Sequence, residues 1–173
     1  MNYATIKRND IANGTGVRVS LFVSGCTHKC KGCFNEVAWD FNYGEKFTLE
    51  TEELIISYLK PDFVEGLTLL GGEPMEPSNQ RALLPFVKKV KEIYPDKTIW
   101  CYTGYTLEKD LLGESRVNIE CTGKLLSYID VLVDGEFVQD LYDISLQFRG
   151  SSNQRIIDLK PTLSSGELVL WND

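Results

Sequence analysis

The chain has 173 residues, of which 43% are hydrophobic and 25% are charged, and these values are ordinary for one globular domain. A formal net charge of −7 argues against a broad basic surface that would bind a nucleic-acid backbone. The chain has no apolar run near the ~20 residues that cross a bilayer and no apolar stretch directly after Met1, so we expect a cytoplasmic protein that binds neither nucleic acid nor membrane.

Strands and helices alternate through the first half of the chain. Residues 16–24 alternate apolar with polar or small side chains and predict a strand, and a loop with three cysteines follows at once. Thr48 can cap a helix that ends before Pro61, where continuation is discouraged. Residues 66–70 predict a second strand, which ends at the Gly-Gly-Glu-Pro turn of residues 71–74.

The same alternation continues in the second half. Ser78 opens a helix with apolar side chains at helical spacing, and Pro85 inside it predicts a kink or a restarted helix. Residues 98–102 predict a third strand, which ends at the Thr-Gly-Tyr turn of residues 103–105. Residues 130–133 predict a fourth strand, followed by Asp-Gly-Glu. Two further helical segments are expected between these strands, at residues 107–112 and 122–127.

This order of elements predicts an α/β fold with a mainly parallel sheet. A closed eight-fold barrel needs ~250 residues, so we expect either a partial barrel or an open, mostly parallel sheet, forming a single domain over residues 1–173. Residues 156–159 and 167–171 can pair as a C-terminal hairpin around residues 161–166. The turns that follow the four predicted strands should gather at one rim, outside the carboxyl ends of the strands.

The cysteine loop carries the pattern CxxxCxxC, formed by Cys26, Cys30 and Cys33. Three thiolates within eight residues can surround one compact metal centre, because Gly25 and Gly32 let the backbone pass close to it. We favour a 4Fe–4S cluster, in which three protein ligands leave one iron open to a small molecule.

Two other interpretations of this loop stay open. One is a structural zinc site with His28, the only histidine, as the fourth ligand, although such sites usually combine two ligand pairs from separate segments. The other is a redox dithiol formed by the second and third cysteines, which leaves the first unexplained. For Cys101 and Cys121 we expect the role of small buried hydrophobic residues.

The cysteine motif after one strand and Gly-Gly-Glu after the next together resemble the radical S-adenosylmethionine (SAM) enzymes. Four further segments are similar to the activating proteins of anaerobic ribonucleoside-triphosphate reductases: residues 13–26, residues 32–35 with Trp39, residues 134–137 and residues 148–155. Many radical SAM enzymes have an aromatic residue just before the third cysteine, whereas this chain has Gly32 there and Phe34 after the cysteine.

The resemblance implies a site for both a 4Fe–4S cluster and SAM. Cys26, Cys30 and Cys33 would hold the cluster, and the amino and carboxylate groups of SAM would bind the open iron. Glu73 would accept a hydrogen bond from the SAM ammonium group, with Gly71 and Gly72 allowing close approach. The cofactor-binding residues expected on this basis are Gly32, Cys33, Phe34, Gly71, Gly72, Glu73 and Pro74.

The resemblance also implies the reaction. An electron from the cluster cleaves SAM to methionine and a 5′-deoxyadenosyl radical, which removes hydrogen from a backbone glycine of the reductase, so no side chain is expected to be catalytic beyond the cluster and SAM. The expected partners are the large subunit of the reductase and a low-potential electron donor such as a flavodoxin.

The alternatives to this function are activation of another glycyl-radical enzyme, a small-molecule reaction as in deazapurine biosynthesis, and a zinc-stabilised interaction module. We expect Tyr102 and Tyr105 to be packing residues. The candidate rim contacts to SAM or partner are Asn13, Arg18, Arg149 and Arg155.

Overall fold

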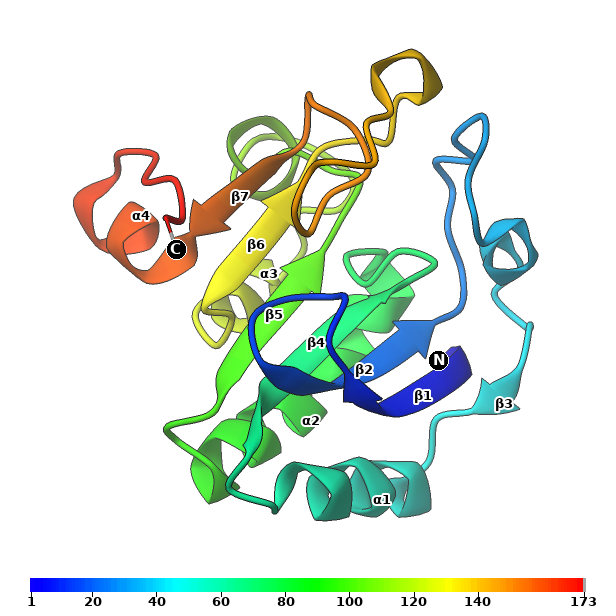
Figure 1. Ribbon diagram of the computed structural model, residues 1–173, viewed down its shortest axis with the longest axis vertical. Helices are drawn as coiled ribbons and strands as arrows, with labels where there is room; N and C mark the ends of the chain where they lie inside the picture. The colour runs from blue at the N-terminus through cyan, green and yellow to red at the C-terminus, as the bar shows by residue number, and fades with distance from the viewer. Residues whose placement is uncertain (173) are drawn as a thin grey trace.

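A seven-stranded sheet runs through the computed structural model, which describes residues 1–172 (Figure 1). The strand order is β3-β1-β2-β4-β5-β6-β7. The strands are β1 (Asn2–Asp10), β2 (Val17–Val23), β3 (Glu45–Lys46), β4 (Val64–Gly71), β5 (Thr98–Tyr102), β6 (Val131–Asp134) and β7 (Arg155–Asp158). The helices are α1 (Leu49–Leu59), α2 (Pro77–Ile93), α3 (Thr122–Leu126) and α4 (Leu159–Ser165), with the shorter turns η1 (Glu36–Trp39), η2 (Leu107–Leu111) and η3 (Gln139–Leu141).

The central strands β2, β4, β5 and β6 are parallel, and the pairs at both edges are antiparallel. The predicted α/β class is therefore confirmed. Because β3 and β7 lie at opposite ends of the strand order, the sheet is open. Asp173, the last residue of the predicted domain, lies outside the described residues.

The two faces of the sheet carry different cores. On one face, Val19, Leu21 and Leu69 are fully buried in a cluster that also contains Ile55 of α1 and Phe86 of α2. Figure 1 shows α2 and α3 behind the sheet on this side and α1 below it. The alternate residues face the other way, and there a smaller cluster forms from Trp100, Val131 and Val133, with Tyr102, Phe148, Ile156 and Trp171 against it.

Local sequence explains the two long helices. The Thr48 hydroxyl accepts a hydrogen bond from the Thr51 backbone, and the Thr51 side chain accepts one in return, so α1 begins where predicted. Pro77 opens α2 at a position where its missing N–H is not needed. Helix α2 then runs through Pro85 without a break, so the predicted restart there is wrong.

Two predictions about the ends of the chain are also corrected. Strands β1 and β3 were not predicted; β3 lies at the edge of the sheet and β1 next to it, both are antiparallel, and their residues are mostly exposed or half-buried. The C-terminal hairpin loop is instead helix α4, because Pro161 lies in the first turn of a helix, where proline is tolerated. The chain does return to the sheet after α4, since Leu170 forms an antiparallel bridge with Ile157.

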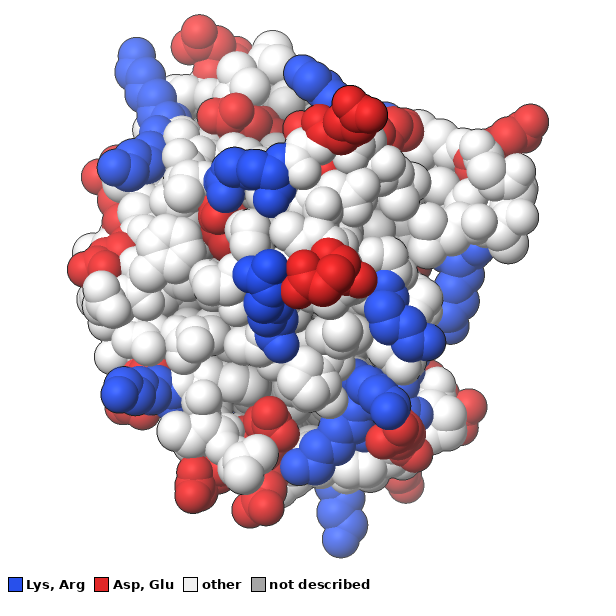
Figure 2. All heavy atoms as spheres, turned by 180° about the vertical axis from the view of Figure 1, so that it is seen from behind, with Lys and Arg blue, Asp and Glu red and all other residues white. Residues whose placement is uncertain are grey.

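Charge is mixed on the face of the molecule that Figure 2 shows, where Lys and Arg side chains lie among Asp and Glu. Among the ion pairs that helix α2 forms are Arg81 with Glu120 and Lys88 with Glu92. Within residues 1–172, no helix combines the length and the apolar content that crossing a membrane requires.

Candidate functional site

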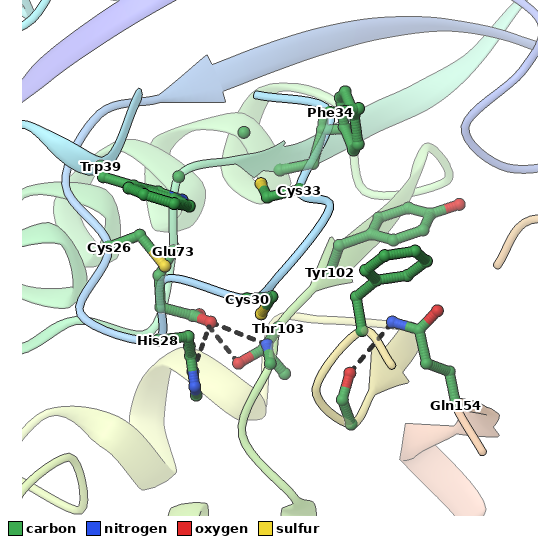
Figure 3. Close-up of a pocket in the computed structure, with 16 residues that line it drawn as sticks. Cys26, His28, Cys30, Cys33, Phe34, Trp39, Glu73, Tyr102, Thr103 and Gln154 are labelled. Atoms are coloured by element: carbon green, nitrogen blue, oxygen red, sulfur yellow. Dashed lines mark hydrogen bonds and ion pairs between the residues drawn. The ribbon is translucent and has the colours of Figure 1, made fainter. Parts of the chain in front are cut away.

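A cavity of about 140 Å³ lies at the carboxyl ends of the parallel strands (Figure 3). All four turns that were expected to share this rim contribute to its wall, as the topology predicts. The lining residues are Cys26, His28, Cys30, Cys33, Phe34, Trp39, Leu70, Gly71, Gly72, Glu73, Tyr102, Thr103, Gly104, Gly135, Phe137 and Gln154.

The three cysteines of the motif all line this cavity. Cys26 is buried, and Cys30 and Cys33 are half-buried. The loop is shaped by backbone hydrogen bonds from Gly25 to Ala38 (2.8 Å), from Cys26 to Trp39 (3.2 Å) and from Cys33 to Cys30 (3.2 Å). The other two cysteines, Cys101 and Cys121, are buried away from the cavity wall, which confirms that both are buried residues.

Burial strengthens the hold of the Cys26 and Cys30 thiols on their protons when no metal is bound. Burial raises the pKa of Cys26 to about 11, and the Glu73 charge adds to the effect. Burial also raises the pKa of Cys30 to about 12, with a further contribution from Glu136. A metal centre bound here must therefore displace protons from these thiols.

The arrangement differs from that of a mononuclear zinc site. A tetrahedral zinc ion holds its sulfur ligands about 3.8 Å apart. Among residues 1–172, no three His, Cys, Asp or Glu side chains are grouped in a way that could hold one metal ion. Three thiols on the wall of one cavity are a donor set that suits a polynuclear cluster.

The turn of residues 71–74 packs directly on the cysteine loop. Gly72 donates its N–H to the Val23 carbonyl (2.7 Å), and Glu73 donates its N–H to the Gly25 carbonyl (2.8 Å). A Cβ on Gly72 would lie 2.8 Å from the carbonyl oxygens of both Gly25 and Ala38. Gly71 has a φ of +111°, in the region that favours glycine. These glycines therefore let the turn approach the backbone of the cysteine loop.

Glu73 is 1% exposed, and its carboxylate accepts hydrogen bonds from three groups of this chain. Oε1 accepts from the Thr103 hydroxyl and the Met75 N–H, both at 2.8 Å, and Oε2 accepts from the Gly104 N–H at 2.7 Å. Figure 3 shows the carboxylate between Thr103 and His28. An ammonium group in the cavity would share Oε2 with Gly104.

His28 is paired with Glu73 and packs against the Tyr105 ring in a tilted arrangement. Its Nε2 lies 3.3 Å from Glu73 Oε2, and the centroids of the His28 and Tyr105 rings are 4.2 Å apart. Burial by itself lowers the pKa of His28, but the nearby Glu73 carboxylate outweighs it and raises the pKa overall. This engagement with a carboxylate favours a bracing role for His28 over that of a metal ligand.

A second, largely aromatic cavity of about 430 Å³ adjoins the first, and its size is in the range of small-molecule sites. Its walls include Phe34, which is 86% exposed, together with Phe137 and Phe148. Tyr102, expected only to pack, lines both cavities, and its buried hydroxyl has no hydrogen-bond partner among the described residues. Gly32 lies at the edge of this second cavity beside Gln139.

The segment of residues 135–154 supplies the wall residues that the sequence analysis did not single out, chiefly Phe137, Phe148 and Gln154. Gln154 organises this segment, because its Oε1 accepts hydrogen bonds from the N–H groups of Gly150 (2.9 Å) and Ser151 (3.1 Å). These residues have no periodicity or metal-ligand spacing that would have revealed them. Only their place inside the segments used for the resemblance pointed to this part of the chain.

Two of the four predicted rim contacts are wrong. Arg18 is 0% exposed and lies near the start of β2, at the opposite end of the strand from the cysteines. Asn13 lies in the loop before the same strand and donates a hydrogen bond to Asp10 (2.6 Å). The other two lie nearer the rim: Arg149 lines the second cavity, and Arg155 forms ion pairs with Asp134 and Glu108.

Comparison with known proteins adds an independent finding. The 4Fe-4S single cluster domain family matches residues 12–157. The chain is 48% identical over 158 residues to the anaerobic ribonucleoside-triphosphate reductase-activating protein of Haemophilus influenzae, covering 90% of this chain and 97% of that protein. Proteins of the same name from Escherichia coli K12 and Enterobacteria phage T4 are 42% and 40% identical, covering 92% and 90% of this chain and 100% and 93% of their own lengths. The family match includes all three cysteines and the four turns at the rim.

Proposed function

Because the chain belongs to the family of anaerobic ribonucleoside-triphosphate reductase-activating proteins, we propose that it generates a glycyl radical on such a reductase through reductive cleavage of SAM at a 4Fe–4S cluster. The observation that carries this proposal is the presence of Cys26, Cys30 and Cys33 on the wall of one cavity at the carboxyl ends of the parallel strands. The reductase is then a polypeptide substrate, and the enzyme is an oxidoreductase of the radical SAM class.

The donor set fits the cluster. Cys26, Cys30 and Cys33 supply three thiolates from one loop, and the backbone bonds at Gly25 and Cys26 hold the start of that loop against residues 38 and 39. When bound, the cluster supplies the electron that cleaves SAM to methionine and the 5′-deoxyadenosyl radical. The residues of the chain bind, orient and shield these groups.

Glu73 and the aromatic walls have separate tasks in this proposal. Glu73 presents a buried carboxylate to the cavity and accepts a charge-assisted hydrogen bond from the SAM ammonium group, sharing Oε2 with Gly104. Phe34, Trp39 and Phe137 surround the cavity with apolar surface, which keeps water away from a reactive radical. The second cavity offers the further room that the adenosyl part of SAM needs.

A polypeptide substrate needs access from outside, and the rim provides exposed apolar side chains for it. Phe34 in the cysteine loop is 86% exposed, and Tyr142 in the segment of residues 135–154, which lines the second cavity, is 53% exposed. A glycine-bearing loop of the large reductase subunit would approach between these segments. The electron donor in this proposal is a low-potential protein such as a flavodoxin.

The proposal is tested with anaerobically reconstituted protein, SAM and a chemical reductant, with and without the reductase. We expect 5′-deoxyadenosine to form and a glycyl radical signal to appear in electron paramagnetic resonance (EPR) spectra when the reductase is present. Replacing Cys26, Cys30 or Cys33 with Ala should abolish both products, whereas Cys121→Ala, a matched change outside the cavity, should not. Cleavage of SAM without any radical on the reductase would assign the chain to a different radical SAM reaction.

A further inference from the structure

The carboxylate of Glu76 is a buried charged group that the proposed function does not use. Glu76 is the residue before helix α2, and its side chain is only 2% exposed. Residues at this position often cap the helix that follows, yet the Glu76 side chain makes no such hydrogen bond to α2. Its oxygens instead accept hydrogen bonds from other segments of the chain.

The Glu76 carboxylate accepts hydrogen bonds from three other loops. Thr27 of the cysteine loop donates its N–H (3.2 Å) and its hydroxyl (2.6 Å) to Oε1. Arg116, from the segment before α3, donates Nη1 to Oε2 and Nη2 to Oε1, both at 3.0 Å. Tyr105 donates its hydroxyl to Oε1 at 3.0 Å. We call these four residues, Thr27, Glu76, Tyr105 and Arg116, the Glu76 cluster.

Two of the three residues between the first two cysteines are thereby held by groups outside their own loop. Glu76 holds Thr27, and Glu73 lies 3.3 Å from the His28 ring nitrogen. The next residue, Lys29, has a φ of +54°, which residues other than glycine rarely adopt. Such a conformation persists where the surrounding contacts determine it. Two buried carboxylates of residues 71–77 therefore set the path of the chain from Cys26 to Cys30.

We propose that Glu76 and Arg116 are positioning residues for the metal site, which hold Thr27 and with it the neighbouring Cys26 thiol at the wall of the cavity. This role rests on the proposed function, because it concerns a cysteine that would ligate the cluster. Arg116 is 53% exposed, so its removal leaves little empty space in the core. It does leave the buried Glu76 carboxylate without its bidentate partner. Opening of the cysteine loop then lets water solvate this carboxylate.

The first part of the test uses the protein without a cluster. In Arg116→Ala and Thr27→Val, we expect alkylation of Cys26, followed by mass spectrometry, to be about tenfold faster than in the unaltered protein. Cys101, fully buried in β5, reports whether the whole fold opens and should stay unreactive. The matched control is Arg81→Ala, because Arg81 also joins α2 to the segment before α3, through Glu120, without touching the cysteine loop.

The second part uses the anaerobically reconstituted protein. Iron and sulfide content, the EPR spectrum and the midpoint potential of the reduced cluster should all change in Arg116→Ala and stay unchanged in Arg81→Ala. Arg116→Lys keeps the charge and should restore part of the difference. Glu76→Gln is included with a melting curve, and if it does not fold, the Arg116 and Thr27 variants decide the question.

The positioning role is overturned if Cys26 alkylation and the cluster spectra in Arg116→Ala and Thr27→Val match those of Arg81→Ala. It is also overturned if Cys101 becomes reactive together with Cys26, since the change is then global unfolding. An unaltered protein that never takes up a 4Fe–4S cluster would contradict the proposed function instead, and the alkylation rates would still decide whether the Glu76 cluster holds Cys26.

Discussion

The close packing of the glycine turn on the cysteine loop predicts that Gly72→Ala destabilises the protein. The added methyl group would lie 2.8 Å from two carbonyl oxygens, those of Gly25 and Ala38, and 3.0 Å from the Gly25 nitrogen. Ordinary contact begins at 3.4 Å, so the methyl group is about 0.6 Å too close to both oxygens. All three atoms belong to the backbone, and relief therefore requires the two loops to separate.

The magnitude follows from what that separation disturbs. Overpacking a tight contact costs about 1–3 kcal/mol. Two backbone hydrogen bonds join the same loops, from Gly72 to Val23 at 2.7 Å and from Glu73 to Gly25 at 2.8 Å. Weakening them adds about 0.5–1.5 kcal/mol. We therefore expect the free energy of unfolding to fall by about 2–4 kcal/mol.

The measurement is urea unfolding of the reduced protein without a cluster, followed by circular dichroism. The control is Gly123→Ala in helix α3, where the new methyl group would meet no atom within 4 Å. That change should stabilise the protein by about 0.5–1 kcal/mol, since alanine loses less backbone entropy than glycine in a helix. A Gly72→Ala protein as stable as the unaltered chain would refute the packing argument.

Three further predictions concern buried polar groups. Arg18→Met should lower the free energy of unfolding by about 3–5 kcal/mol in urea titrations, because it leaves the acceptors of a fully buried guanidinium unsatisfied; a loss below 1 kcal/mol would contradict this. Thr103→Val should cost about 1–2 kcal/mol by the same assay, because it removes a donor to the buried Glu73 carboxylate, whereas an unchanged midpoint would show that the bond contributes nothing. Burial by itself raises the pKa of Asp130, but hydrogen bonds, including one from Lys91 (2.8 Å), lower it below 3.8 overall. A carboxyl group with a lowered pKa stabilises the fold above pH ~4 and loses this contribution as the pH falls through its folded-state pKa. Asp130→Asn should therefore be less stable than the unaltered protein at pH 7, and thermal unfolding should show this difference shrinking as the pH falls below ~4; a difference independent of pH would contradict the assignment.

The parts of the fold that the sequence predicted well are those with strong local signals. The strand over residues 98–102 and the helix beginning after Thr48 were both predicted, because burial on both faces and a capping residue are visible in the sequence. Strand β1, next to the edge of the sheet, was missed, since its half-exposed residues include many polar ones. Helix α4 was predicted to be a turn because proline usually interrupts a helix. Pro161 is tolerated only because it lies in the first turn, and the sequence did not show where the helix begins.

In the candidate site, too, the features with a local sequence signal were predicted and the others were not. The spacing of Cys26, Cys30 and Cys33 identified the cysteine loop, because ligand spacing is a local property of the sequence. The environment of Arg18 was mispredicted, since a sequence does not show at which end of a strand a charged side chain will be buried. The Glu76 cluster escaped notice for a related reason: its members lie as far apart in the chain as Thr27 and Arg116.

The buried Arg18 side chain has a consequence for how the sheet can move. Its guanidinium donates to Thr68 Oγ1 (2.7 Å) and the Leu67 carbonyl (2.8 Å) on β4, and to Thr98 Oγ1 (3.0 Å) and the Thr98 carbonyl (2.9 Å) on β5. Sliding β2 by one residue would turn this cation toward the helices and bury it, unpaired, among apolar groups. One charge thus prevents strand slippage, and in doing so it fixes how far the cysteines at the distal end of β2 stand from the turn at the end of β4.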